Sequence, residues 1–302
     1  MPPKSKKKDA TNDDRQGALT IKEATELPLE EISGLCLRAR SDRRELLAIG
    51  DESFEIVAVD IDAGGRAGEA RRHDLRALIS PESGKRGGSQ WEGIAADGDG
   101  RVFVLQENPG VVFVLNAALE SLLHVIELRV DDERGPAGGW IADENSRGEG
   151  IVPLANGHLL IVKEKRPPLF VEFGPKGDRA QGVSPALLMP GMVPLPAERR
   201  AVYVALQAWT VEGADDVVDL SDIAVGPKGG LYLLSDEERC LLRVDAHLPA
   251  EGGAARVVER WELPKKMKKP EGLVMLEDGS PLVAVDAAEG RDNLFLLTPI
   301  ES

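Results

Sequence analysis

Acidic residues recur at a fixed place in a short phrase that the chain repeats. The phrase is Glu-Gly-Ile or a close variant, and its copies are centred on Ser33, Glu92, Glu149, Ser221 and Glu271. A turn and an apolar run follow each copy and end in a second acid, the set being Asp51, Glu107, Glu164, Asp236 and Asp286. This acid lies 15 residues after the centre in four copies and 18 in the first. If each copy starts a strand that turns back antiparallel, both acids lie at the same end of the unit.

Such a convergence of carboxylates predicts a cation site. Eight acids around one opening repel one another, and a divalent cation removes that repulsion. Ca²⁺ accepts six to eight oxygen ligands with flexible geometry, and Mg²⁺ or Mn²⁺ are alternatives. His-rich or Cys-rich clusters are missing, which argues against zinc and copper. We therefore expect Glu92, Glu149 and Glu271 to be metal ligands, although acids at strand ends also simply hold turns.

The segments that carry these acids are predicted to be short strands. Runs rich in Val, Ile and Leu are bounded by Gly, Asp and Pro, and the only short helix candidate is 117–123. Successive phrase centres are 59, 57, 72 and 50 residues apart, which suits four-stranded blades. The sequence predicts an all-β, five-bladed β-propeller. The 72-residue gap leaves a six-bladed ring as the alternative, although 201–206 reads as the outer strand of the third blade.

The N-terminal segment is predicted to close the ring. Residues 18–28 resemble 255–264, and both segments directly precede a copy of the phrase. The last unit ends one strand short, so the N-terminal strand is expected to complete it and protect its edge.

Bulk properties limit the function. The chain has 302 residues and a net charge of −15, which argues against binding nucleic acid. It has two isolated cysteines and no apolar run of about 18 residues, so we expect neither a disulfide nor a membrane span. Polar residues 1–16 are expected to form a disordered tail before a single domain, 17–302. A cytoplasmic monomer is the expectation.

The phrases, with their Asp-Gly-Arg or Asn-Gly-His turns and following acid, resemble those of SdiA-regulated proteins and the related phytase-like esterase domains. More distantly, they are similar to the gluconolactonase-like propellers. In those propellers, acids at the strand start bind a central Ca²⁺. The resemblance thus implies Glu92, Glu149 and Glu271 as ligands, with Asp222 a weaker match because an acid replaces the usual Gly. Phytase-type propellers also bind phosphate through clustered Lys and Arg.

These features predict a metal-dependent hydrolase of a small ester, lactone or phosphoester. Glu107 or Asp286 is the expected catalytic base. The residues expected to contact substrate are Lys163, Lys165, Arg166, Trp140, Asp51, Glu164 and Asp236. The four histidines are not expected to reach the mouth. The alternative is a non-catalytic propeller that binds a partner protein or small ligand, with 180–196 as a Met-containing loop over one face.

Overall fold

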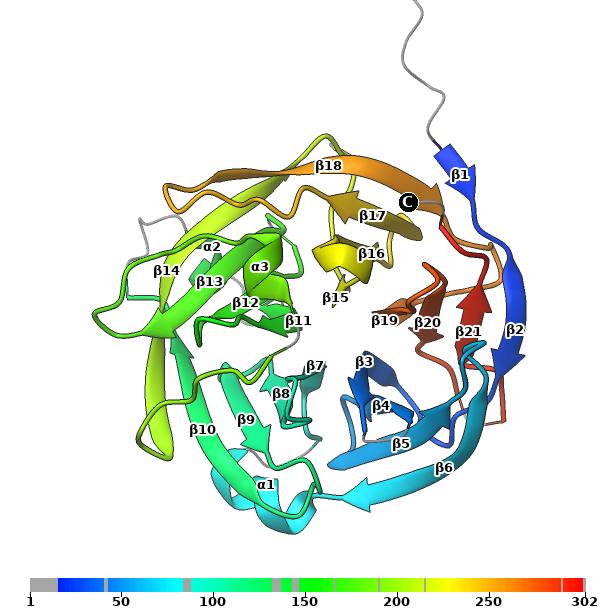
Figure 1. Cartoon of the computed structure of the whole chain (residues 1–302), viewed down its shortest axis with the longest axis horizontal. Coiled ribbons are helices and arrows are strands. Elements are labelled where there is room, and N and C mark those ends of the chain that lie inside the picture. Colours follow the sequence, from blue (N-terminus) through cyan, green and yellow to red (C-terminus); the bar gives the residue numbers. More distant parts are fainter. Residues whose placement is uncertain are drawn as a thin grey trace, which may run out of the picture.

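A ring of antiparallel strand groups surrounds a central axis in the computed structural model of the chain (Figure 1). The structure describes residues 16–300 except 41–42, 84–87, 132–136, 143–146, 166, 190, 215 and 289. The predicted tail, 1–16, lies outside this part of the chain apart from Gln16, which begins β1. The all-β class is confirmed, and the arrangement is that of a β-propeller.

Each group contains four strands that pair in the order in which they radiate from the axis. The first group is β3 (Ile32–Ala39), β4 (Arg44–Gly50), β5 (Glu55–Ile61) and β6 (Ala67–Asp74). The next is β7 (Trp91–Ala96), β8 (Val102–Gln106), β9 (Val111–Leu115) and β10 (Leu122–Arg129). The next is β11 (Gly148–Pro153), β12 (Leu159–Lys163), β13 (Leu169–Pro175) and β14 (Arg200–Glu212). The outer strand predicted at 201–206 is thus part of β14.

The remaining groups complete the ring. One is β15 (Asp222–Val225), β16 (Leu231–Ser235), β17 (Cys240–Val244) and β18 (Gly253–Glu262). The other is β19 (Pro270–Met275), β20 (Pro281–Val285), β21 (Leu294–Leu297) and the N-terminal β2 (Ile21–Thr25). The N-terminal strand therefore pairs with the C-terminal one, as predicted. The short β1 (Gln16–Ala18) runs parallel to β18.

Apolar side chains fill the space between neighbouring groups. One buried cluster joins β4 and β5 to β8 and β9 around Trp91, and another joins β12 to β16 and β17 around Trp209. A further cluster joins β20 and β21 back to β4 and β5, so packing continues around the whole ring. Full burial of each large apolar side chain contributes roughly 1.5–3 kcal/mol, and this packing therefore fixes the inner strands.

Helices are few and short in the described part of the chain. They are α1 (Arg76–Ser83), α2 (Gly139–Ala142), α3 (Pro185–Leu188) and the 3₁₀ turn η1 (Pro227–Gly229). The prediction of a helix at 117–123 is wrong. The Asn116 side chain accepts the backbone N–H groups of Glu120 and Ser121, which folds a turn before β10.

Both cysteines, Cys36 and Cys240, are free and buried, and burial raises the pKa of each thiol to about 12. Among the described residues, the structure contains no helix with the length and hydrophobicity needed to cross a membrane.

Candidate functional site: an acidic cavity at one end of the channel

The acidic cavity lies at the end of the channel where the inner strands begin, and its volume is about 350 Å³. The lining includes two lysines, Lys165 and Lys269, and two serines, Ser33 and Ser221. Its acidic residues are Glu31, Asp51, Glu92, Glu107, Glu149, Glu164, Asp219, Asp236, Glu237, Glu271 and Asp286. The structure thus brings together both predicted sets of acids, those at the strand start and those at the end of the second strand.

A β-bulge places the residue at the centre of four of the phrases. The pairing of the inner strand with its neighbour skips one position in four groups, at Ser33, Glu92, Glu149 and Glu271. A bulge releases one residue from the ladder and redirects its side chain, and bulges are over-represented beside active sites. Here each redirected side chain lies on the wall of the acidic cavity.

The second set of acids is held by the same backbone connection in each of these groups. The amide of Glu107 donates to the carbonyl of Gln90 at 3.0 Å, and the amide of Asp286 donates to that of Lys269 at 2.9 Å. In the same way, the amide of Asp51 donates to the carbonyl of Glu31 at 3.3 Å. Gln90, Lys269 and Glu31 all have positive φ, near +50°. This repeated turn joins the end of the second strand to the residue two positions before the centre of the phrase.

Glycine at the next position allows the inner strands to approach closely. A Cβ on Gly93 would lie 3.2 Å from the carbonyl oxygen of Glu149, and one on Gly272 would lie 2.7 Å from Leu35. The glycines of the phrase are therefore needed for the narrow channel below the acidic cavity.

Asp222 occupies this glycine position in the remaining group and does not line the acidic cavity. Its Oδ1 accepts the N–H of Ile223 and its Oδ2 accepts the N–H of Leu273, both at 2.7 Å. The residue is buried and lines neither this cavity nor the one at the other end of the channel. Its carboxyl group therefore ties inner strands β15 and β19 together.

Burial and mutual repulsion raise the pKa of the central acids. Desolvation, followed by the charges of Asp51 and Glu107, holds the pKa of Glu92 well above its usual range. The pKa of Glu149 is shifted in the same direction by burial and by Glu92. Burial and the Asp236 charge raise the pKa of Glu271 to about 8. A cation would relieve this repulsion, and the donor set of oxygens suits Ca²⁺.

The cationic residues are distributed differently from the prediction. Lys165 lines the acidic cavity and forms an ion pair with Glu164 at 2.5 Å. Lys163 is fully buried and donates to the backbone carbonyl of Lys165 instead of lining the cavity. Arg166 lies outside the described residues. Lys269, which the sequence analysis did not select, pairs with Asp286 at 2.5 Å.

Trp140 lies in the core and does not overhang the mouth. Its ring packs edge-to-face on Phe173 at 5.1 Å between ring centroids, and it is 3% exposed. The small residues that precede Trp140 in the sequence do not indicate that its side chain is buried. As expected, the histidines are not among the residues that line the acidic cavity.

Asp219 is a buried acid that the sequence analysis missed. Its Oδ2 accepts the N–H of Asp236 at 2.9 Å, and its Oδ1 accepts the Ser235 hydroxyl at 2.6 Å. In this group the Asp219 side chain thus replaces the backbone carbonyl that holds the second acid elsewhere. Its position two residues before Ser221, equivalent to that of Glu31, is the signal that could have revealed it.

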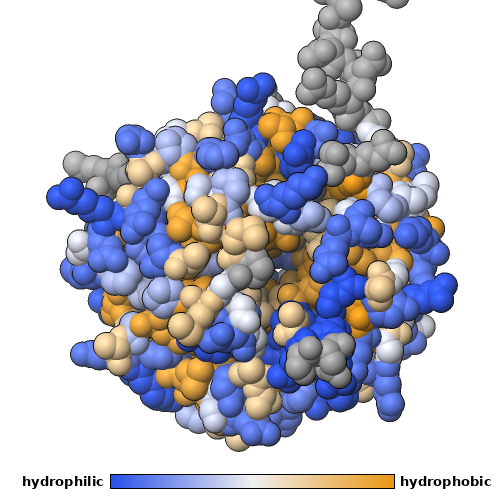
Figure 2. Space-filling view, viewed as in Figure 1, coloured by the Kyte–Doolittle hydropathy of each residue, from blue (hydrophilic) through white to orange (hydrophobic). Residues whose placement is uncertain are grey.

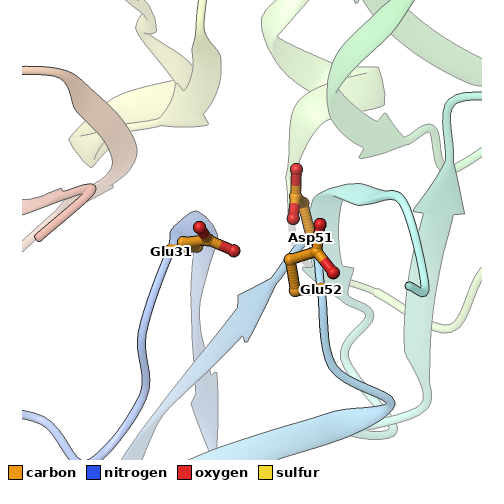
Figure 3. A group of neighbouring side chains, drawn as sticks. All are labelled: Glu31, Asp51 and Glu52. Carbon is orange, nitrogen blue, oxygen red and sulfur yellow. The ribbon is translucent and has the colours of Figure 1, made fainter. Parts of the chain in front are cut away.

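A second acidic group lies at the rim. Glu31, Asp51 and Glu52 place carboxylate oxygens within 4.8 Å of one another (Figure 3). Glu31 and Asp51 also line the acidic cavity, and burial followed by the charge of Glu52 raises the pKa of Asp51. The rim therefore extends the negative potential of the cavity outwards.

Comparison with known proteins supports the resemblance drawn from the phrases. The SdiA-regulated family model matches residues 144–285, which include three of the copies. No curated protein matches the chain.

The chain also matches solved structures at low identity. A Bacteroides caccae protein of unknown function is 14% identical, with 85% of this chain and 72% of that one covered and a TM-score of 0.43. Virginiamycin B lyase from Staphylococcus aureus is 10% identical, with 89% and 71% covered and a TM-score of 0.40. The PQQ-bound aldose sugar dehydrogenase of Streptomyces coelicolor is 12% identical, with 94% and 98% covered and a TM-score of 0.46.

Proposed function

We propose that the chain is a five-bladed propeller that binds a divalent cation in its acidic cavity and hydrolyses a small ester, lactone or phosphoester there. Four strands pair outward from the axis in each group, and β2 completes the last, which supports five blades over six. The outer strands β10, β14 and β18 also pair with one another between groups. One observation supports the site above all others: Glu92, Glu149 and Glu271 come from separate inner strands and line one cavity. Ca²⁺ is the preferred ion, with Mg²⁺ or Mn²⁺ as alternatives.

The three central glutamates would hold the ion. Their pKa values are raised in its absence, so binding releases protons and becomes tighter as pH rises. When bound, the ion would polarise a carbonyl or phosphoryl oxygen and lower the pKa of a water molecule. Asp222 is not included among the ligands, because its oxygens already accept backbone N–H groups.

The surrounding residues would position the substrate and move the proton. Glu107 is 8% exposed and its Oε1 accepts the N–H of Arg147 at 2.9 Å, which orients the carboxylate as a base. Asp286 is the second candidate base and is oriented by Lys269. Lys165 and Lys269 would attract an anionic group of the substrate, each by releasing its present carboxylate partner.

A binding role without catalysis is the second candidate. The observation that favours it is the fixed, narrow channel whose two ends carry different chemistry, acidic at one end and apolar at the other. A rigid ring of this kind also suits a protein that only binds a ligand.

The test begins with the melting temperature of chelated protein to which Ca²⁺, Mg²⁺ or Mn²⁺ is added. At 100 times the dissociation constant, a cation stabilises the fold by about 2.7 kcal/mol. Glu149→Gln should remove this rise, whereas Glu251→Gln, at an exposed turn, should keep it. A melting temperature that none of the three ions changes would refute the metal site.

Catalysis is tested separately on lactone, ester and phosphoester substrates with the loaded protein. Glu149→Gln and Glu107→Gln should each abolish turnover, the first with loss of the ion and the second without it. A cation-dependent melting temperature without turnover of any substrate would favour the binding role.

A further inference from the structure

A second cavity, which we call the apolar hollow, lies at the opposite end of the channel and has a volume of about 300 Å³. Its inner wall contains one aliphatic residue from each phrase, at the position after the glycine or Asp222. These residues are Leu35, Ile94, Ile151, Ile223 and Leu273. Along each inner strand, the residue that faces the acidic cavity is thus followed two positions later by one that lines the apolar hollow.

Small side chains leave the hollow open. The next residues along the inner strands include Cys36, Ala95 and Ala224, which also line it. On the face that carries α3, hydrophobic residues lie beside the central opening, with hydrophilic ones among them and over the rest of the face (Figure 2). Volume and composition therefore match a small-molecule pocket, which is typically apolar and at least about 300 Å³ in size.

The loop after α3 borders the hollow with flexible apolar side chains. Leu188, Met189 and Val193 line it. Met189 is 55% exposed and Met192, in the same loop, is 65% exposed. These two methionines and Val218 are the large hydrophobic residues that stand exposed in the described part of the chain. Methionine adapts its shape to different ligands, so this loop is suited to close over an apolar one.

The charged groups of the lining do not favour a charged ligand. Asp97 is bound by its neighbours: its Oδ2 accepts Arg101 Nε at 2.7 Å and the N–H of Val193 at 3.3 Å. Glu277 is exposed at the rim. Ionic attraction is therefore small within the hollow, in contrast to the acidic cavity.

We propose that the apolar hollow is a second binding site, which takes a small, uncharged, mainly apolar organic molecule. A second copy of the chain fits less well. A stable interface buries about 800 Å² on each partner, whereas two exposed methionines around a recess offer much less apolar surface. A small ligand would instead be buried against the inner strands and the loop.

The proposal does not depend on the acidic cavity. Asp222, which lines neither cavity, binds backbone N–H groups of residues that line the hollow, and its neighbour Ser221 lines the acidic cavity. It therefore lies between the two sites. Failure of cation binding would leave the second site unaffected, and the reverse also holds.

The test is a fluorescence titration of the full chain with N-phenyl-1-naphthylamine, a neutral apolar probe. Wild-type protein should bind it saturably with one site per chain. Met189→Asp places a charge on the wall and should weaken binding at least tenfold, whereas Met189→Leu should keep it. Val218→Asp is the matched control, because Val218 is also exposed but lies away from the hollow.

A second variant fills the space. Ala96→Phe should abolish saturable binding, whereas Ala63→Phe, in an exposed turn, should not change it. Equal melting temperatures of the variants would show that each is folded. Absence of saturable binding to wild-type protein, or equal affinity of Met189→Asp and Val218→Asp, would overturn the proposal. Unchanged probe affinity in Glu149→Gln is expected, and a parallel loss there would also overturn it.

Discussion

At the scale of single residues, one position of the phrase determines which chemistry a blade offers. Glutamate at the bulge contributes a carboxylate in three groups, whereas Ser33 and Ser221 donate their hydroxyls to carbonyls of the neighbouring inner strand. The serines thus join adjacent groups, and the glutamates remain available for a ligand. The acidic cavity is therefore asymmetric, although the backbone that surrounds it is repeated.

Glu271 should make the stability of the fold depend on pH. Its pKa rises from an ordinary value near 4.5 to about 8 in the folded chain, so the folded state binds the extra proton between these values. The contribution of Glu271 to stability is therefore fully present below pH 4.5 and is lost as pH rises through 8. In the presence of a metal chelator, the melting temperature of the wild-type protein should fall by on the order of 5 °C between pH 5 and 8.5.

The matched measurement uses Glu271→Gln, which cannot titrate, and compares the two slopes under the same conditions. A smaller fall in the variant is expected, and added Ca²⁺ should reduce the fall in wild-type protein by binding the ionised carboxylates. Identical slopes for the two proteins would show that Glu271 is not perturbed.

At the scale of elements, a buried arginine of the first group, held by an ion pair within that group, also bonds the second group. Arg38 in β3 donates to Glu45 in β4 through Nε at 2.7 Å, and its Nη1 donates to the carbonyl of Gly100 at 2.9 Å. Gly100 lies in the turn between β7 and β8. Burial raises the pKa of Glu45, but the hydrogen bonds and charges of Arg38, Arg71 and Arg40 together outweigh it and lower the pKa overall.

Removing the charge of Glu45 should therefore cost more than removing an exposed one. Glu45→Gln leaves the 3% exposed Arg38 without its counterion, and the expected loss is about 3–5 kcal/mol by urea denaturation. Glu127→Gln breaks the exposed pair with Arg129 and should change stability by less than about 1 kcal/mol. A double change, Arg38→Met with Glu45→Leu, should recover part of the loss, and equal losses for the single and double variants would contradict this account.

The sequence was sufficient for the elements and for the position of the acidic cavity, because both depend on a pattern that repeats. Strand, turn and acid recur in register, so Glu92 and Glu107 could be placed together without coordinates. Residues that break the pattern could not be placed. Asp222 stands at a glycine position and binds backbone amides, and Trp140 packs on Phe173, a contact between segments that no local pattern indicates.

At the scale of the whole molecule, the pairing of the N-terminal strand with the C-terminal one closes the ring. β2 pairs with β21, with Ala24 opposite Phe295 and Thr25 opposite Leu294. Just beyond β2, the Asn293 side chain accepts the N–H of Leu27 at 2.7 Å and donates to its carbonyl. In Figure 1 the N-terminal strand lies outside β21 and covers that edge.

Removing β1 and β2 should open the ring. A chain that starts at Leu27 would expose the edge of β21, where unpaired backbone groups favour aggregation. We expect its melting temperature to fall by on the order of 10 °C relative to a chain that starts at Gln16, since the cluster around Leu297 also loses Ile21 and Ala24.

A synthetic peptide of residues 17–29 should restore stability in a concentration-dependent way, because the bound peptide replaces the strand that was removed. The same peptide with Ala24→Pro cannot make the ladder bond and should fail. Equal melting temperatures of the two truncated chains would mean that the ring is held by interfaces between its inner strands alone.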